Sequence, residues 1–174
     1  MNPEIKIKQE ERFKNTENME QRYKQWAENL SYMAATMANI GQETGGEAFL
    51  QKVEDAIFEG GKANAKWLKD AAGIGESETA VDCHKIGKVF DAMDDSLANF
   101  WDGYVEKSPK VLEKRLVTCP VAEGFSLAPV VCERLMLGGA QGLLKALNPK
   151  ATIRFTELLP NGDDACCYQI GIED

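Results

Sequence analysis

Residues 151–174 read ATIRFTELLPNGDDACCYQIGIED and carry the strongest strand and turn signals of the chain. Apolar and polar side chains alternate from Thr152 to Leu159 and again from Ala165 to Ile172, as in strands that bury one face. Between them, Pro160-Asn161-Gly162-Asp163 combines residue types that favour a tight turn. The sequence therefore predicts a C-terminal antiparallel β-hairpin.

Outward from the hairpin, the sequence predicts one more strand and one helix. Leu112 to Cys119 is a short strand-like segment that Pro120 closes. Ser126 is placed to cap a helix that has Pro129 in its first turn. Asn148-Pro149 is expected to end this helix, because the residue before a proline avoids helical backbone angles.

The N-terminal half has the periodicity of helices. From Met19 to Ile40, apolar residues recur at steps of three and four, and this helix is expected to stop at Gly41. A second helix is predicted after Thr44 and Glu47, which have capping-box spacing. At Gly60-Gly61 this helix either breaks or allows another backbone to pack closely.

A third helix is predicted from Asp82 to about Lys107, before Ser108-Pro109. Helices followed by a few strands predict an α+β fold, with a helix-rich N-terminal half packed on a small antiparallel sheet. Residues 1–18 are expected to be a charged, flexible segment, and residues 19–174 a single domain.

The composition narrows the possible partners. The chain has 174 residues and a formal net charge of −8, so phosphate backbones and anionic membranes would be repelled. No apolar run reaches the ~18 residues of a membrane helix, and the charged N-terminus lacks the apolar core of a signal peptide. We therefore expect a cytoplasmic protein that binds a small molecule and neither nucleic acid nor a membrane.

Five cysteines, an odd number without a CxxC pair, favour free thiols over a disulfide framework. Three stand where sites are often built: Cys119 at a strand end, Cys132 near the first turn of a helix, and Cys166 at the start of the last strand. The alternative is that all three are small core residues. The carboxylates close by in sequence are Glu133 and Asp163, and Asp163 alternatively only completes the turn.

Cys132 is predicted to be the most acidic thiol, because unpaired N–H groups at a helix start favour the thiolate. Glu133 opposes this, but its side chain should point about 100° away around the helix. A zinc site that combines the cysteines with His84, the only histidine, is a further alternative. No phosphate-binding loop or other cofactor motif is found, so no cofactor is expected.

Several elements follow one another in a recognisable order: Val117-Thr118-Cys119-Pro120, Cys132, Leu147-Asn148-Pro149, Leu158-Leu159 and Gly162-Asp163-Asp164-Ala165-Cys166. This order resembles the L-2-amino-thiazoline-4-carboxylic acid hydrolase family, most clearly over residues 82–173. That family is similar to 4-vinyl-reductase domains, which resemble small subunits of the vesicle-tethering transport-particle complex. The resemblance implies an α+β domain, often dimeric, with helices covering an antiparallel sheet.

The resemblance implies hydrolytic opening of a cyclic amidine at the carbon between sulfur and nitrogen. One of the three thiolates would add to that carbon, or Glu133 or Asp163 would activate water. Arg134 and Arg154 are the nearest candidates to bind the substrate carboxylate. Two other interpretations stay open: a non-catalytic module that binds a small apolar or aromatic ligand, and a cysteine-based metal-binding accessory protein.

A homodimer is also expected. The helix predicted from Met19 to Ile40 carries many large apolar side chains that a lone helix must bury against a partner. The sequence therefore predicts dimerisation through the N-terminal helices.

Overall fold

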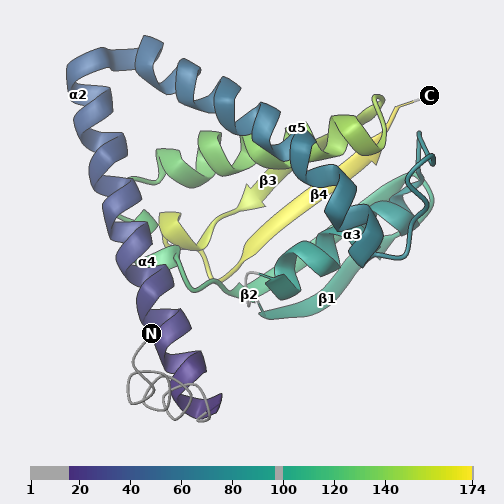
Figure 1. Cartoon of the computed structure of the whole chain (residues 1–174), viewed down its shortest axis with the longest axis horizontal. Helices are drawn as coiled ribbons and strands as arrows, with labels where there is room; N and C mark the ends of the chain where they lie inside the picture. Colours follow the sequence, from purple (N-terminus) through teal and green to yellow (C-terminus); the bar gives the residue numbers. More distant parts are fainter. Residues whose placement is uncertain (1–15, 97–99, 174) are drawn as a thin grey trace, which may run out of the picture.

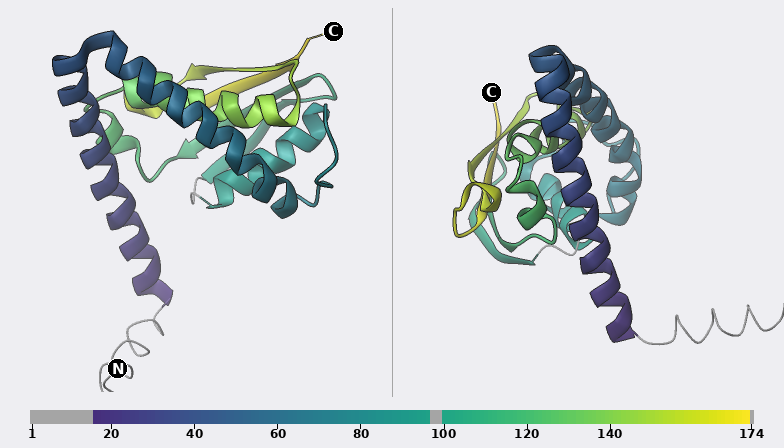
Figure 2. Two further views of the ribbon diagram at one scale, coloured as in Figure 1. Left: turned by 45° about the horizontal axis from the view of Figure 1, so that its top comes forward. Right: turned by 90° about the vertical axis from the view of Figure 1, so that its left-hand side faces the viewer.

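A computed structural model describes residues 16–96 and 100–173. The charged segment predicted at 1–18 lies outside the described residues, except for 16–18, which begin the first helix. Helices cover one face of a four-stranded antiparallel sheet (Figures 1 and 2). The predicted α+β class, a helix-rich N-terminal half on a small antiparallel sheet, is confirmed.

The sheet has the order β1-β2-β4-β3, formed by β1 (Phe100–Lys107), β2 (Val111–Thr118), β3 (Ala151–Glu157) and β4 (Cys166–Ile172). β4 is central, and its Ile170 lies opposite Leu112 of β2 on one side and Ile153 of β3 on the other. A turn of 3-10 helix, η2 (Leu159–Asn161), and Gly162 with φ 92° connect β3 to β4. The predicted C-terminal hairpin is confirmed.

The two faces of the sheet differ in polarity. On the open face, Arg154 donates to Gln169 at 2.7 Å, and Gln169 donates to Glu113 at 3.0 Å. The face under the helices is mostly apolar, and its strands bury Leu112, Leu116, Ile153, Cys166, Tyr168 and Ile170. Strand alternation therefore separates a solvated ladder from the core.

The first helix, α2 (Thr16–Ala71), is bent at Gly46, whose φ of 57° and ψ of −149° only glycine adopts readily. Figure 1 shows its two halves meeting at an angle. The predicted end at Gly41 was wrong, because Gly41 continues the helix beneath the ring of Phe49. Thr44 does not cap a second helix: its hydroxyl donates to the carbonyl of Ile40 at 2.7 Å.

Gly60-Gly61 does not break α2, and the alternative of close backbone packing is confirmed. A Cβ on Gly61 would collide with the carbonyl oxygen of Gly139 in α5 (Leu137–Leu147). Gly142 of α5 sits equally close to the backbone of Phe58. The second half of α2 therefore lies directly on α5 (Figure 1).

The third predicted helix was too long. α3 ends early, spanning Cys83–Ser96, and Phe100–Lys107 forms β1 instead. Gly103 has φ 140°, outside the helical region, and it lies at a register shift in the pairing of β1 with β2. Tyr104 reaches back to α3, where its hydroxyl donates to Asp91 at 2.6 Å. The apolar spacing of this segment also suits a helix, and tertiary contacts therefore stabilise it as a strand.

The predicted helix from Ser126 begins later than expected and consists of two pieces, after a separate short helix. α4 (Ala122–Phe125) comes first, and Ser126 follows its last turn rather than capping a new helix. A turn of π-helix, η1 (Val131–Met136), then leads directly into α5, which ends before Asn148-Pro149 as predicted. In the described part of the chain, no helix has the length and apolar character needed to cross a membrane.

Candidate functional site

Cys119, Cys132 and Cys166 come together although they are far apart in the sequence. Cys119 follows β2, Cys132 lies in η1, and Cys166 begins β4. Negative charge at Cys119 or Cys166 raises the pKa of Cys132, and charge at Cys166 raises the pKa of Cys119. The three thiols therefore lie within electrostatic reach of one another.

Their surroundings are apolar. The larger core cluster, called the sheet cluster here, includes Phe90, Leu116, Leu144, Cys166 and Ile170. The smaller one, the arm cluster, consists of Ala35, Ala38, Phe125, Ala128, Val131 and Leu135. Cys132 packs against both clusters. Cys132 therefore lies where the two clusters meet, and Cys166 is part of the sheet cluster.

Burial keeps these thiols protonated at neutral pH. It raises the pKa of Cys119 to about 11 and that of Cys132 to about 12, and it also raises the pKa of Cys166. The prediction that Cys132 is the most acidic thiol was wrong. The N–H of Cys132 already donates to the carbonyl of Pro129 at 2.9 Å, so no free helix-start donor compensates for lost hydration.

Backbone donors are found instead at the other two thiols. The N–H groups of Val121 and Ala122 face Cys119 and oppose the rise of its pKa. The N–H of Leu159 donates to the sulfur of Cys166 at 3.3 Å. These donors could stabilise negative charge that developed on either sulfur, and sequence reasoning missed them.

Glu133 and Asp163 lie at the solvent edge of the site. Glu133 is exposed and accepts a hydrogen bond from Asn161 at 2.9 Å, which links η1 to the turn before β4. Asp163 accepts from the N–H of Leu158 at 2.7 Å, so it completes the turn, as the alternative interpretation held. Its charge nevertheless raises the pKa of Cys166.

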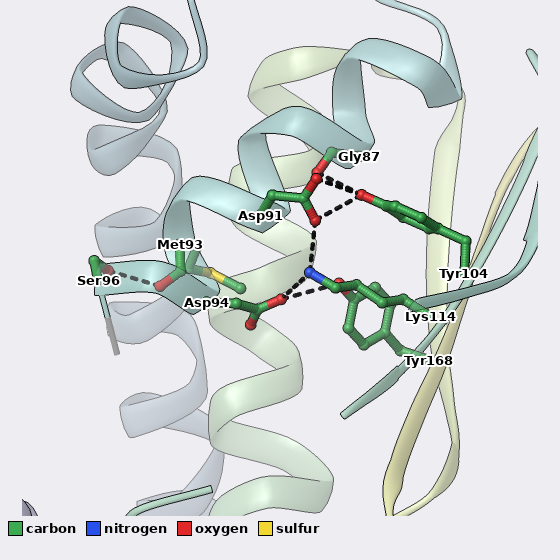
Figure 3. A network of polar contacts seen from close by, with 8 residues as sticks. All are labelled: Gly87, Asp91, Met93, Asp94, Ser96, Tyr104, Lys114 and Tyr168. Carbon is green, nitrogen blue, oxygen red and sulfur yellow. Dashed lines mark hydrogen bonds and ion pairs between the residues drawn. The ribbon is translucent and has the colours of Figure 1, made fainter. Parts of the chain in front are cut away.

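A buried polar network links α3 to the sheet (Figure 3). Lys114 of β2 is fully buried, and its ammonium lies 2.7 Å from Asp91 and 2.6 Å from Asp94, both on α3. Tyr104 donates to Asp91, and Tyr168 donates to Asp94 at 3.5 Å. Burial raises the pKa of both tyrosines, which keeps them neutral.

The network lies within electrostatic reach of two of the thiols. Charge at Asp94 raises the pKa of both Cys119 and Cys166. Tyr168 stands two residues after Cys166 on the same face of β4. Sequence reasoning missed this network, although Lys114 alternates with Leu112 and Leu116 and was therefore placed to point inward.

The remaining candidates are engaged elsewhere. Arg134 pairs with Glu54 and Glu47 of α2, each at 2.7 Å, and Arg154 lies on the open face of the sheet. His84 is exposed at the start of α3. Over residues 16–96 and 100–173, no group of three or more His, Cys, Asp or Glu side chains could hold a metal ion, so the zinc alternative finds no support.

An open polar pocket of about 370 Å³ also lies near the last turn. Its lining combines Arg115, Glu157, Gly162, Asp163 and Asp164. Asp163 is thus shared between this pocket and the edge of the thiol site, but none of the three thiols lines the pocket. The apolar and polar sites are therefore distinct.

Comparison with known proteins gives a relationship at the level of the fold. No family model matches the sequence, and no curated protein matches it. Trafficking protein particle complex subunit 3 from Naegleria fowleri, in a structure covalently bound to palmitic acid, is similar with a TM-score of 0.58 and 14% identity. The similarity covers 85% of this chain and 95% of that one.

The phenol-responsive sensory domain of the transcription activator PoxR, in a structure with phenol, is similar with a TM-score of 0.55 and 12% identity. The similarity covers 82% of this chain and 74% of that one. At these identities the fold is shared, and function does not follow from it.

Proposed function

We propose that this domain binds a small apolar or aromatic molecule between the sheet and the helices, beside Cys119, Cys132 and Cys166. One observation carries the proposal: Cys132 packs against both apolar clusters, Cys166 belongs to the sheet cluster, and the desolvated thiol of Cys119 lies within electrostatic reach of both. Ligand sites for small molecules are mostly apolar and carry a few well-placed polar groups.

The polar groups for such a ligand stand close by. Protonated thiols behave as small, polarisable apolar groups, so they suit a hydrocarbon chain or an aromatic ring. Asp94 lies within electrostatic reach of Cys119 and Cys166, and Lys114 and Tyr168 hold it in place. A ligand hydroxyl could donate to this carboxylate while the rest of the molecule stays among the thiols.

The ligands of the two similar structures support this choice. One similar structure is covalently bound to palmitic acid and the other contains phenol, so both similar folds accommodate an apolar molecule. The sequence also suggests a relationship to 4-vinyl-reductase domains. A ligand-binding module like these domains is the function proposed here.

The test uses phenol and decanoate as probes, with thermal unfolding and thiol alkylation as the measurements. We expect at least one probe to raise the melting temperature by roughly 2 °C or more at saturating concentration. The same probe should slow alkylation of Cys119 and Cys132, while Cys83, buried at the start of α3, keeps its rate. Unchanged melting and unchanged alkylation with both probes would contradict the proposal.

A second candidate is hydrolysis of a 2-aminothiazoline carboxylate, as the hydrolase resemblance implies. The observation that favours it is that Glu133 and Asp163 both lie at the edge of the thiol site, as the charges they exert on Cys132 and Cys166 indicate. Water would add across the ring carbon and the C–N bond would open, so the product is one water heavier than the substrate. Mass spectrometry after incubation with the thiazoline tests this: a product absent with Cys119→Ser or Cys166→Ser supports it, and no product with the native protein rejects it.

A further inference from the structure

The first half of α2 exposes an apolar stripe along its length. Its five exposed members are Trp26, Leu30, Met33, Met37 and Ile40, and Trp26 and Met37 are 61% and 67% exposed. Tyr23, half-buried, continues the stripe toward the N-terminus. Figure 2 shows this half of α2 projecting past the rest of the domain. Large apolar side chains in such a position mark an interaction surface.

The spacing of the stripe fits another helix. From Tyr23 to Ile40 the steps are three, four, three, four and three residues, the a/d pattern of a coiled-coil seam. The same helix packs on its own domain through a different row, formed by Ala27, Ser31, Ala35 and Ala38, all buried. The stripe is therefore a second seam, which the fold of one chain leaves exposed.

We propose that the stripe binds a second copy of this chain in an antiparallel helix pair, with the two-fold axis passing between Ser31 and Tyr32. In this register the stripe matches itself along its whole length. Tyr23 faces the partner's Ile40, Trp26 faces the partner's Met37, and Leu30 faces the partner's Met33. A two-fold interface needs such self-complementarity, and a heptad seam supplies it.

The flanking residues support the same register. Arg22 on one helix lies beside the partner's Glu43, and the two-fold repeats this pair at the other end. Both side chains are exposed in the single chain. On the other flank the helix carries only small side chains, Ala34 and Ala27, the latter buried against its own domain, so the two helices can approach closely. In a parallel pair Arg22 would face alanine, and the charge complementarity would be lost.

Sedimentation equilibrium of the full chain tests the dimer. We expect twice the chain mass of 19.2 kDa at micromolar concentration. Trp26→Glu should return a monomer, because it buries a charge in the seam. Trp67→Glu is the matched control on the other half of α2, where Trp67 is 47% exposed, and it should stay dimeric. A monomeric native protein, or equal masses for the two variants, would overturn the proposal.

A charge swap tests the antiparallel register. Arg22→Glu and Glu43→Arg should each weaken the dimer by about tenfold, since each replaces both ion pairs by like-charge contacts. The double variant, which restores opposite charges across the two-fold, should regain the native dissociation constant. Single variants without effect, or a double variant weaker than both singles, would overturn the antiparallel register. All these positions are exposed in the single chain, so circular dichroism should show unchanged folding.

Discussion

The ammonium of Lys114 lies 2.6 Å from a carboxylate oxygen of Asp94, and both side chains are almost completely shielded from solvent. The pair joins the middle of β2 to the last turn of α3, and the charge of Asp94 raises the pKa of Cys119 and Cys166. An ion pair at this depth costs desolvation energy that only full hydrogen bonding offsets. Under the proposed function, the pair holds polar groups at one side of the ligand site.

Removing the lysine should damage the fold severely. Lys114→Met leaves Asp94 buried without its cation, which should cost about 3–5 kcal/mol in the free energy of unfolding. The double variant Lys114→Met/Asp94→Leu should recover part of this loss, because it removes both buried charges. Urea denaturation measures both variants, and Lys150→Met at an exposed position is the control. A loss below about 1 kcal/mol for Lys114→Met would mean that the pair is not buried.

The raised thiol pKa values predict a fall in stability in alkali. The pKa of Cys132 rises from 9.0 unfolded to about 12 folded, so its contribution is complete below pH 9. As the pH rises from 9 toward 12, the unfolded state loses its proton first, and stability falls by at most about 1.4 kcal/mol per pH unit for this one group. Cys132→Ala should make the pH dependence of the urea midpoint less steep over pH 9–10.5. An unchanged slope would contradict the burial of this thiol.

The cysteine thiols of the native protein should react slowly with alkylating reagents. At pH 7 all five cysteines are free, and none has a lowered pKa among the described residues. Alkylation followed by mass spectrometry should therefore show slow labelling that denaturant accelerates, with Cys132 not ahead of Cys119. Rapid labelling of Cys132 alone would restore it as a nucleophile.

Two adjacent glycines give a matched test of the helix crossing. Gly61→Ala places a methyl group against the carbonyl of Gly139 and should destabilise the domain by about 1–3 kcal/mol. Gly60→Ala meets no atom within 4 Å and should stabilise the helix by about 0.5–1 kcal/mol. Thermal or urea unfolding measures both. Equal effects of the two variants would contradict the close packing of α2 on α5.

The sequence predicted the elements whose signals are local. The hairpin of β3 and β4 followed from strand alternation around a turn that Gly162 completes. β1 could not be predicted in this way, because Phe100 and Tyr104 also have helical spacing, and the contact of Tyr104 with Asp91 settles its structure. Long-range contacts of this kind are not encoded in the spacing of neighbouring residues.

At the candidate site, too, features with local sequence signals were predicted and features that depend on burial or long-range contacts were not. The three cysteines were identified from their positions at the ends of elements, and their thiols do gather in one region. The acidity predicted for Cys132 failed because it considered the helix start and not the burial that η1 imposes. Asp94 was not identified, although it lies four residues after Phe90 on the buried face of α3, where a carboxylate requires a buried cation.

Calorimetric titration of phenol and decanoate shows whether the three thiols line a ligand site. Three proteins are compared: the native chain, Cys132→Trp, which places an indole where the sheet cluster and the arm cluster meet, and Leu127→Trp, the control at an exposed position. Circular dichroism first establishes that all three are folded. We predict saturable binding of at least one probe to the native chain and to Leu127→Trp, and none to Cys132→Trp. Binding that Cys132→Trp leaves unchanged, or no binding of either probe to the native chain, would contradict a ligand site at the three thiols.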